Sequence, residues 1–126
     1  YGQIRFMPEA GYGRCTRWLT VVELGEGGGR RTKDGGDTVI GDRQSAQGGP
    51  SERVERVRLA LEAENIESRP VWKPMHMQPV FKRVKAYGGE VCERLFANGL
   101  CLPSGVGLSE ADVERVCAVV KAKTQD

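Results

Sequence analysis

Apolar side chains recur at helical spacing between residues 51 and 64. Val54, Val57 and Leu61 stand at positions i, i+3 and i+7, so a helix would gather them on one face. The stretch opens with a serine, a residue type that caps helix N-termini. Asn65 follows, where a helix end favours a left-handed residue. The pattern predicts an amphipathic helix that docks one face on a sheet.

A shorter apolar pattern predicts a second helix over residues 90–97. A Gly-Gly pair precedes it, and the following pair Asn98–Gly99 is typical of a helix end. Residues 100–102 are apolar and are followed by a proline, which predicts a short buried strand. The buried side of this helix is expected to hold Val91, Cys92, Leu95 and Phe96.

A third helix is predicted to start at Ser109 and to run to about residue 123. Ser109 and Asp112 have the spacing of a capping box, in which each side chain bonds the backbone N–H of the other residue. Lys121 and Lys123 lie near the other end, where positive charge complements the helix dipole. The buried side of this helix is expected to hold Val113, Val116, Cys117 and Val120.

Two apolar runs near the start of the chain predict strands. Residues 4–7 form a short run that a proline stops. Residues 17–24 combine aromatic, β-branched and aliphatic side chains almost without interruption. Such a run favours a central strand that is covered on both faces.

Residues 25–49 break every pattern, because nine of these 25 residues are glycine and the only apolar pair is Val39–Ile40. This composition cannot bury enough surface to offset the entropy of ordering, so we expect a disordered loop. Its start, Gly25–Arg31, lacks the GK[ST] ending and the following helix of a P-loop. We therefore do not expect it to bind phosphate.

Residues 65–79 contain three prolines, at positions 70, 74 and 79. Proline removes a backbone donor and biases the preceding residue toward extended geometry, so this stretch predicts a shaped loop with at most a short strand, starting at Ile66. The loop carries Arg69, Trp72 and the only histidine of the chain, His76. Loops held between rigid elements often carry function.

Composition narrows the class of protein. A chain of 126 residues is one domain's worth. The net charge of +2 comes from interspersed charges, which argues against nucleic acid as a partner. No apolar run approaches the roughly 20 residues that span a bilayer, so no membrane association is expected. The four cysteines form no CxxC pair, so we expect no metal site. We expect the four thiols to be buried, in a protein of the reducing cytoplasm.

Two long runs carry a family resemblance. Residues 66–81, IESRPVWKPMHMQPVF, and residues 93–105, ERLFANGLCLPSG, resemble the C-terminal segment of the DegT/DnrJ/StrS family. Members of that family are pyridoxal phosphate (PLP) aminotransferases that act on nucleotide-linked keto-sugars. The Trp-Leu-Thr of residues 18–20 is similar to a strand of the family, whereas residues 25–49 depart from its much shorter connection.

The resemblance implies the small C-terminal domain of such an enzyme. Its fold would be an α/β sandwich in which a short, mostly antiparallel sheet packs with three helices. Residues 1–126 would form this one domain, with residues 25–49 as an insertion. The large PLP-binding domain would lie upstream of Tyr1, so we expect no catalytic residue, no cofactor-binding residue and no activity in this chain alone. None of its candidate lysines matches the context of the family's Schiff-base lysine: Lys33, Lys73, Lys82, Lys85, Lys121 and Lys123.

The parent reaction would move an amino group from glutamate, through PLP, to a keto-sugar on a nucleotide, and the family resemblance implies a homodimer. In this chain the resemblance implies substrate-binding roles for the loop. Arg69 could bind a carboxylate or a diphosphate, or could tie the loop down. His76 could donate a hydrogen bond or titrate, or be structural. Trp72 could stack on a sugar or base, or anchor the loop to the core.

Lys73 and Gln78 are weaker candidates for substrate binding, and Ser104 is expected to be a turn residue rather than a nucleophile. Two other interpretations stay open at this point. The chain could be a non-catalytic module that binds a sugar nucleotide or a protein. It could also be a truncated or frameshifted remnant without function.

Overall fold

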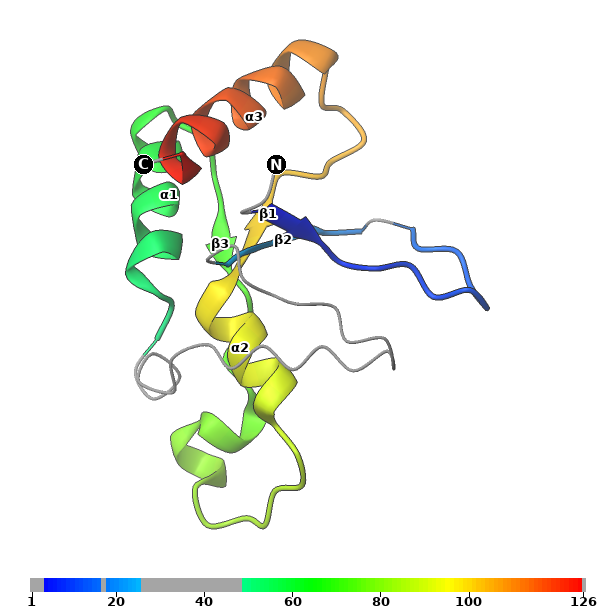
Figure 1. Ribbon diagram of the computed structural model, residues 1–126, viewed down its shortest axis with the longest axis vertical. Coiled ribbons are helices and arrows are strands. Elements are labelled where there is room, and N and C mark those ends of the chain that lie inside the picture. The colour runs from blue at the N-terminus through cyan, green and yellow to red at the C-terminus, as the bar shows by residue number, and fades with distance from the viewer. Residues whose placement is uncertain (1–3, 17, 26–48, 126) are drawn as a thin grey trace.

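The computed structural model describes residues 4–16, 18–25 and 49–125, and in this part the chain forms a single sheet with three helices (Figure 1). The strands are β1 (Ile4–Phe6), β2 (Thr20–Leu24), β3 (Arg69–Pro70) and β4 (Gly99–Leu102). The helices are α1 (Glu52–Ala63), α2 (Glu90–Asn98) and α3 (Glu110–Thr124), with two short 3-10 helices, η1 (Met75–Met77) and η2 (Pro79–Phe81). The predicted fold class, an antiparallel sheet packed with three helices, is confirmed.

The sheet has the strand order β1-β2-β4-β3, and every neighbouring pair is antiparallel. β4 therefore has a partner on each edge. Leu100 lies opposite Val22 of β2 on one side and opposite Pro70 of β3 on the other. This register joins segments that are far apart in the sequence.

One face of the sheet packs against α1 and α3, which lie beside each other in Figure 1. Val54, Val57 and Leu61 of α1 are fully buried, as their helical spacing predicts. The core is made of the apolar residues Val22, Leu24, Val54, Val57, Leu61, Ile66, Leu100, Val116 and Val120. Burial of aliphatic side chains of this size stabilises a fold by about 1.5–3 kcal/mol each.

The opposite face of the sheet carries a buried charge. Glu23 of β2 alternates with the core residues Val22 and Leu24, so its side chain points away from α1 and α3. Its carboxylate lies 3.1 Å from Arg5 Nη2 and 3.4 Å from Arg94 Nε of α2. β2 is thus a central strand covered on both faces, as predicted, but its second face is covered by ion pairs.

The helix ends follow local sequence signals. Ser51 Oγ accepts the Val54 N–H at 3.4 Å, and Asn65 adopts a φ of 56°, as predicted.

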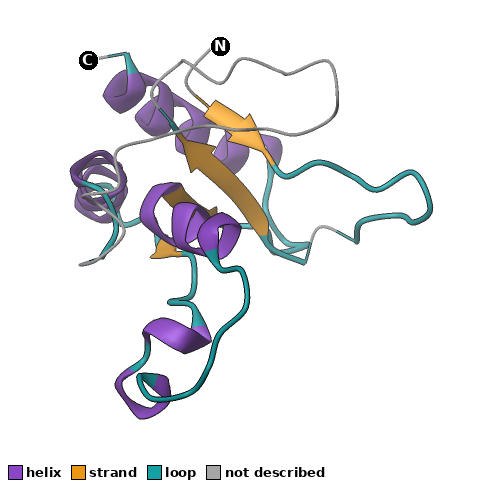
Figure 2. Ribbon diagram, turned by 60° about the horizontal axis from the view of Figure 1, so that its bottom comes forward, coloured by secondary structure: helices purple, strands orange, loops and turns teal. Residues whose placement is uncertain are grey.

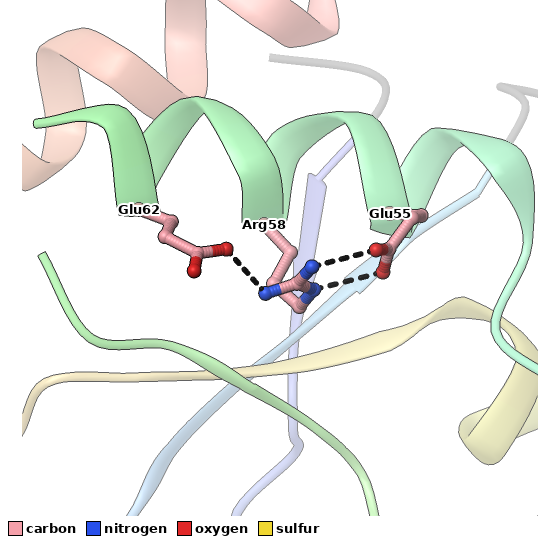
Figure 3. A network of polar contacts seen from close by, with 3 residues as sticks. All are labelled: Glu55, Arg58 and Glu62. Carbon is pink, nitrogen blue, oxygen red and sulfur yellow. Dashed lines mark hydrogen bonds and ion pairs between the residues drawn. The ribbon is translucent and has the colours of Figure 1, made fainter.

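Along α1, Arg58 donates to Glu55 at 2.7 and 2.8 Å and to Glu62 at 2.8 Å (Figure 3). Hydrogen bonds from the guanidinium lower the pKa of Glu55, and the two carboxylates raise the pKa of Arg58.

The strands differ from the prediction at their starts. β2 begins at Thr20, and Trp18 lies before it as an exposed residue. β3 begins at Arg69 rather than Ile66, because the Ile66 N–H bonds Leu61 O at 2.9 Å and holds Ile66 in the core beside α1. The predicted disordered loop over residues 25–49 falls almost entirely outside the described residues and stays a prediction.

The buried sides of the two later helices are narrower than predicted. Val91 and Cys92 are exposed, because α2 is buried only at its C-terminal turn, through Phe96 and Ala97. In α3, Val113 and Cys117 are exposed, and the buried residues are Val116, Val120 and Thr124. A spacing of four residues keeps these three on one narrow stripe.

The expectation of buried thiols is wrong for three of the four cysteines. Cys15, Cys92 and Cys117 are exposed, and only Cys101 is buried, in β4. Burial raises the pKa of the Cys101 thiol, because a thiolate would lose its hydration there.

Gly99 joins α2 to β4 at a point of close approach. Its φ of −95° is open to any residue, so it is not the left-handed residue that ends many helices. A Cβ added at Gly99 would collide with the carbonyl oxygen of Leu95 and would lie 2.5 Å from Val71 Cγ2. The sequence predicts the helix end correctly, but the reason for glycine is space.

We predict that Gly99→Ala destabilises the chain by about 1–3 kcal/mol. The backbone of α2 at Leu95 and the side chain of Val71, which follows β3, must move to admit the methyl group. Urea unfolding followed by far-UV circular dichroism measures this. Gly105→Ala is the matched control, because nothing lies within 4 Å of a Cβ built there. Equal unfolding midpoints for the two variants would contradict the close approach.

We also predict that the capping box of α3 makes stability depend on pH in acid. The Ser109 hydroxyl and N–H donate to Asp112 Oδ2 at 2.6 and 2.9 Å and lower the pKa of that carboxyl. The resulting stabilisation is fully present above the unfolded-state pKa of about 3.9 and is lost as the pH falls through the lower folded-state value.

Asp112→Asn should therefore flatten the rise of the urea midpoint between about pH 2 and pH 5. Glu110→Gln is the control for loss of one negative charge in the same helical turn. An unchanged pH profile in Asp112→Asn would show that the box contributes nothing.

Candidate functional site

The segment between β3 and α2 forms the end of the molecule that lies farthest from α3 (Figure 1). Two consecutive 3-10 helices, η1 and η2, shape it, and Figure 2 shows them protruding beyond α2. Turn hydrogen bonds close them, from Gln78 N–H to Met75 O and from Phe81 N–H to Gln78 O, both at 3.0 Å. Pro74 is buried and fixes this segment to the domain. The predicted shaped loop is thus present.

A polar contact with Glu93 holds His76 against α2. Its Nε2 lies 2.7 Å from Glu93 Oε1. The two side chains are 25% and 33% exposed. Sequence reasoning placed His76 in the loop but did not find Glu93, which is 17 residues away.

Trp72 stacks on Trp18, with ring centroids 6.5 Å apart and an interplanar angle of 21°. Both rings remain largely exposed, at 67% and 78%. Trp72 therefore does not plug the core, and the pair forms an aromatic platform at the surface. Ser104 Oγ donates to Trp18 O at 3.0 Å and holds the backbone under this platform.

Trp18 was missed because the apolar run predicted it to lie inside a buried strand. The sequence contained a signal, because Trp18 stands near the start of the run, beside polar residues. At such a position a strand leaves the sheet and its side chains can be exposed. The platform can stack on a flat ring or on the apolar face of a sugar.

Arg69 projects from β3 at the surface and pairs with Glu67. Its Nε and Nη2 both donate to Glu67 Oε1, at 2.8 and 2.5 Å. Both side chains are exposed, and exposed ion pairs contribute little to stability. An anionic ligand could therefore compete with Glu67. Among the residues that the structure describes, no hydrogen bond, ion pair or ring contact joins Arg69 to Trp72 or His76.

The two weaker candidates lie on the same segment. The Gln78 amide is used within the loop, because its Nε2 donates to Lys73 O at 3.4 Å and to Met75 Sδ at 3.6 Å. The Lys73 side chain is exposed. Substrate-binding roles for Arg69, Trp72, Lys73, His76 and Gln78 stay predictions.

The lysines in the described part of the chain lie at its surface. A Schiff-base lysine needs an enclosed site, and all five lysines in these residues are exposed: Lys73, Lys82, Lys85, Lys121 and Lys123. The hollows along α3 and at the start of α2 are shallow and open.

Within the described ranges, no three His, Cys, Asp or Glu residues are placed to hold a metal ion. None of the helices there has the length and apolar character needed to cross a bilayer.

Comparison with known proteins defines the class to which this domain belongs. Residues 45–121 match the sequence model of the DegT/DnrJ/EryC1/StrS aminotransferase family. The chain belongs to that family.

Individual relatives agree with this assignment. The chain is 38% identical over 121 residues to EpsN of Bacillus subtilis (strain 168), which is named as a pyridoxal phosphate-dependent aminotransferase. It is 34% identical over 108 residues to the GDP-perosamine synthase of Caulobacter vibrioides. These matches cover 93% and 86% of this chain but only 25% and 23% of the relatives, so the chain spans about a quarter of their length.

The fold is shared with solved structures. The PLP and PMP forms of Spr1654 of Streptococcus pneumoniae, named as a sugar aminotransferase, superpose with TM-scores of 0.66 and 0.63. Both matches are 15% identical and cover 98% of this chain and 26% of Spr1654. At this level of identity the likeness concerns the fold.

We predict that the two tryptophans stabilise each other. In a double-mutant cycle, Trp18→Ala and Trp72→Ala should show a coupling of about 0.5–1.5 kcal/mol, the range found for aromatic pairs. Unfolding by urea, followed by far-UV circular dichroism, gives the four free energies. Tyr87→Ala with Trp72→Ala is the control pair, because both residues are exposed and only the tryptophans stack. Additive effects of the two tryptophan substitutions would exclude the stack in solution.

Proposed function

We propose that this chain forms the substrate-facing wall of a PLP-dependent aminotransferase that transfers an amino group from glutamate to a nucleotide-linked keto-sugar. Family membership supports the reaction class. The observation that carries the site is the proline-stiffened segment that includes β3 and the start of the loop to α2, because it presents Arg69, Trp72 and His76. A stiff loop loses little conformational entropy when a ligand binds.

The three side chains supply different interactions in this proposal. The Arg69 guanidinium binds a carboxylate or a diphosphate by exchanging its exposed partner Glu67 for the ligand. The Trp72 ring, backed by Trp18, stacks on a base or a sugar face. His76 bonds a polar group of the substrate, and Lys73 and Gln78 contribute less.

The cofactor chemistry lies outside this chain in the proposal. PLP, when bound to the whole enzyme, supplies the group that carries the amino nitrogen between donor and acceptor. Because the described lysines are exposed, the chain alone should neither hold PLP nor transaminate. In keeping with the family resemblance, we propose that the whole enzyme is a homodimer and acts in the cytoplasm.

A chimera tests the role of Arg69. This chain replaces the matching quarter of the Caulobacter GDP-perosamine synthase, and variants are compared with the active chimera. Arg69→Ala should lower kcat/KM by about 10- to 100-fold, because a hydrogen bond to a charged group contributes about 1.5–3 kcal/mol. Arg56→Ala, which removes an exposed arginine of α1, is the control. Equal kcat/KM values for these two variants would refute the proposed role.

The exposed aromatic platform favours one second candidate, a module that binds a sugar nucleotide without performing chemistry. Binding by the chain and activity of the chimera together distinguish the two. Saturable quenching of the chain's tryptophan fluorescence by GDP-mannose, abolished in Trp72→Ala, together with an inactive chimera, would support the module. Absence of quenching in the chain, together with activity of the chimera, supports the wall of an active site.

A further inference from the structure

We propose that Glu93 is a positioning residue, which binds Nε2 of His76 and thereby presents Nδ1 of the imidazole to a hydroxyl group of the sugar substrate. This inference rests on the proposed function, because only there does His76 face a substrate. Glu93 lies in α2, outside the loop that carries His76.

The geometry begins with two short elements. His76 stands in η1, a three-residue 3-10 helix that could not by itself fix a side chain. Glu93 stands in the first turn of α2, where its own N–H donates to Gly89 O at 2.9 Å. The 2.7 Å contact between Nε2 and Oε1 therefore ties the ring to a helix whose backbone is already ordered.

Gly89 shows that space is kept for this pair. Its φ of 117° is a conformation that side chains disfavour. A Cβ at this position would lie 3.0 Å from His76 Cε1, 3.2 Å from His76 Nε2 and 3.2 Å from Glu93 Oε1. The backbone at position 89 thus favours glycine, and a Cβ there would press on both the imidazole and the carboxylate.

The contact with Glu93 determines which nitrogen of the imidazole carries the proton. An ionised carboxylate can only accept hydrogen bonds, so Nε2 must carry the proton that it shares with Glu93. In the neutral ring the other nitrogen, Nδ1, then holds a lone pair and accepts. Within the described ranges no hydrogen bond uses Nδ1.

An accepting Nδ1 excludes the phosphate groups of a nucleotide sugar as its partner. Phosphate oxygens at neutral pH are acceptors and would find no donor there, whereas hydroxyl groups and the N–H groups of a base donate. Of these donors, the proposal assigns a ring hydroxyl of the sugar to His76. Arg69, which carries only donors, suits the diphosphate or a carboxylate.

The test uses the 126-residue chain labelled with ¹⁵N, because its single histidine gives imidazole signals that need no assignment. The expected spectrum shows Nε2 protonated, Nδ1 unprotonated, and an Nε2–H proton protected from exchange with water. A protonated Nδ1 in the neutral ring, or a freely exchanging Nε2–H, would overturn the proposal without any variant.

Variants separate positioning from general stability. Glu93→Ala should expose the Nε2–H proton to exchange and allow both tautomers, whereas Glu93→Gln should restore the protected signal, because its amide oxygen still accepts. Glu90→Ala is the matched control, since it removes an exposed carboxylate from the same helical turn. Backbone amide spectra show that each variant is folded. An imidazole spectrum of Glu93→Ala identical to that of Glu90→Ala would overturn the proposal.

Kinetics of the chimera distinguish the failure of this inference from that of the proposed function. Glu93→Ala should lower kcat/KM by about tenfold, as expected for one lost hydrogen bond, and Glu93→Gln should recover most of it. If the imidazole is held as expected but His76→Ala, Glu93→Ala and Arg69→Ala all keep the parent kcat/KM, the proposed function fails. If Arg69→Ala and His76→Ala are impaired while Glu93→Ala is not, only the role of Glu93 fails.

Discussion

The pairing of β4 along both of its edges is the constraint on which the rest of this domain depends. β2 reaches it from the start of the chain and β3 from the middle, so a four-residue strand holds two distant segments in register. Its Leu100 and Cys101 are buried. The helix that delivers β4 must turn into the sheet at once, which is why Gly99 stands where a side chain would meet the last turn of α2.

The two faces of the sheet are stabilised by different forces. Aliphatic burial against α1 and α3 is tolerant of small shifts, because dispersion contacts have no direction. On the other face the buried carboxylate of Glu23 lies between Arg5 and Arg94, and loss of both guanidinium groups would leave it buried without a charged partner. Through Arg94 this cluster connects β2 to α2, the helix that carries Glu93.

What could be predicted from the sequence was what neighbouring residues decide. Ser51, Asn65 and the pair Ser109 and Asp112 mark helix ends through their own backbone neighbours, and the structure confirms each. The prolines likewise located the loop and its candidate side chains.

Features that depend on distant packing could not be predicted. Val91 and Cys117 fit an apolar helix face, yet no element in the described part of the chain covers them, and periodicity does not reveal how far a neighbour extends. The candidate site shows the same division. The loop residues were found, whereas their partners Trp18 and Glu93 lie 54 and 17 residues away and meet them only in the folded chain.

The stacked tryptophans have an optical consequence. The chain contains only these two tryptophans, and both are at the surface, outside the aliphatic core. Tryptophan fluorescence therefore reports the contact between the loop that carries Trp72 and the segment before β2 that carries Trp18. It does not report the packing of the core. A local opening of the loop would change the emission of a domain whose core is intact, so agreement between fluorescence and circular dichroism measures the cooperativity that couples the loop to the core.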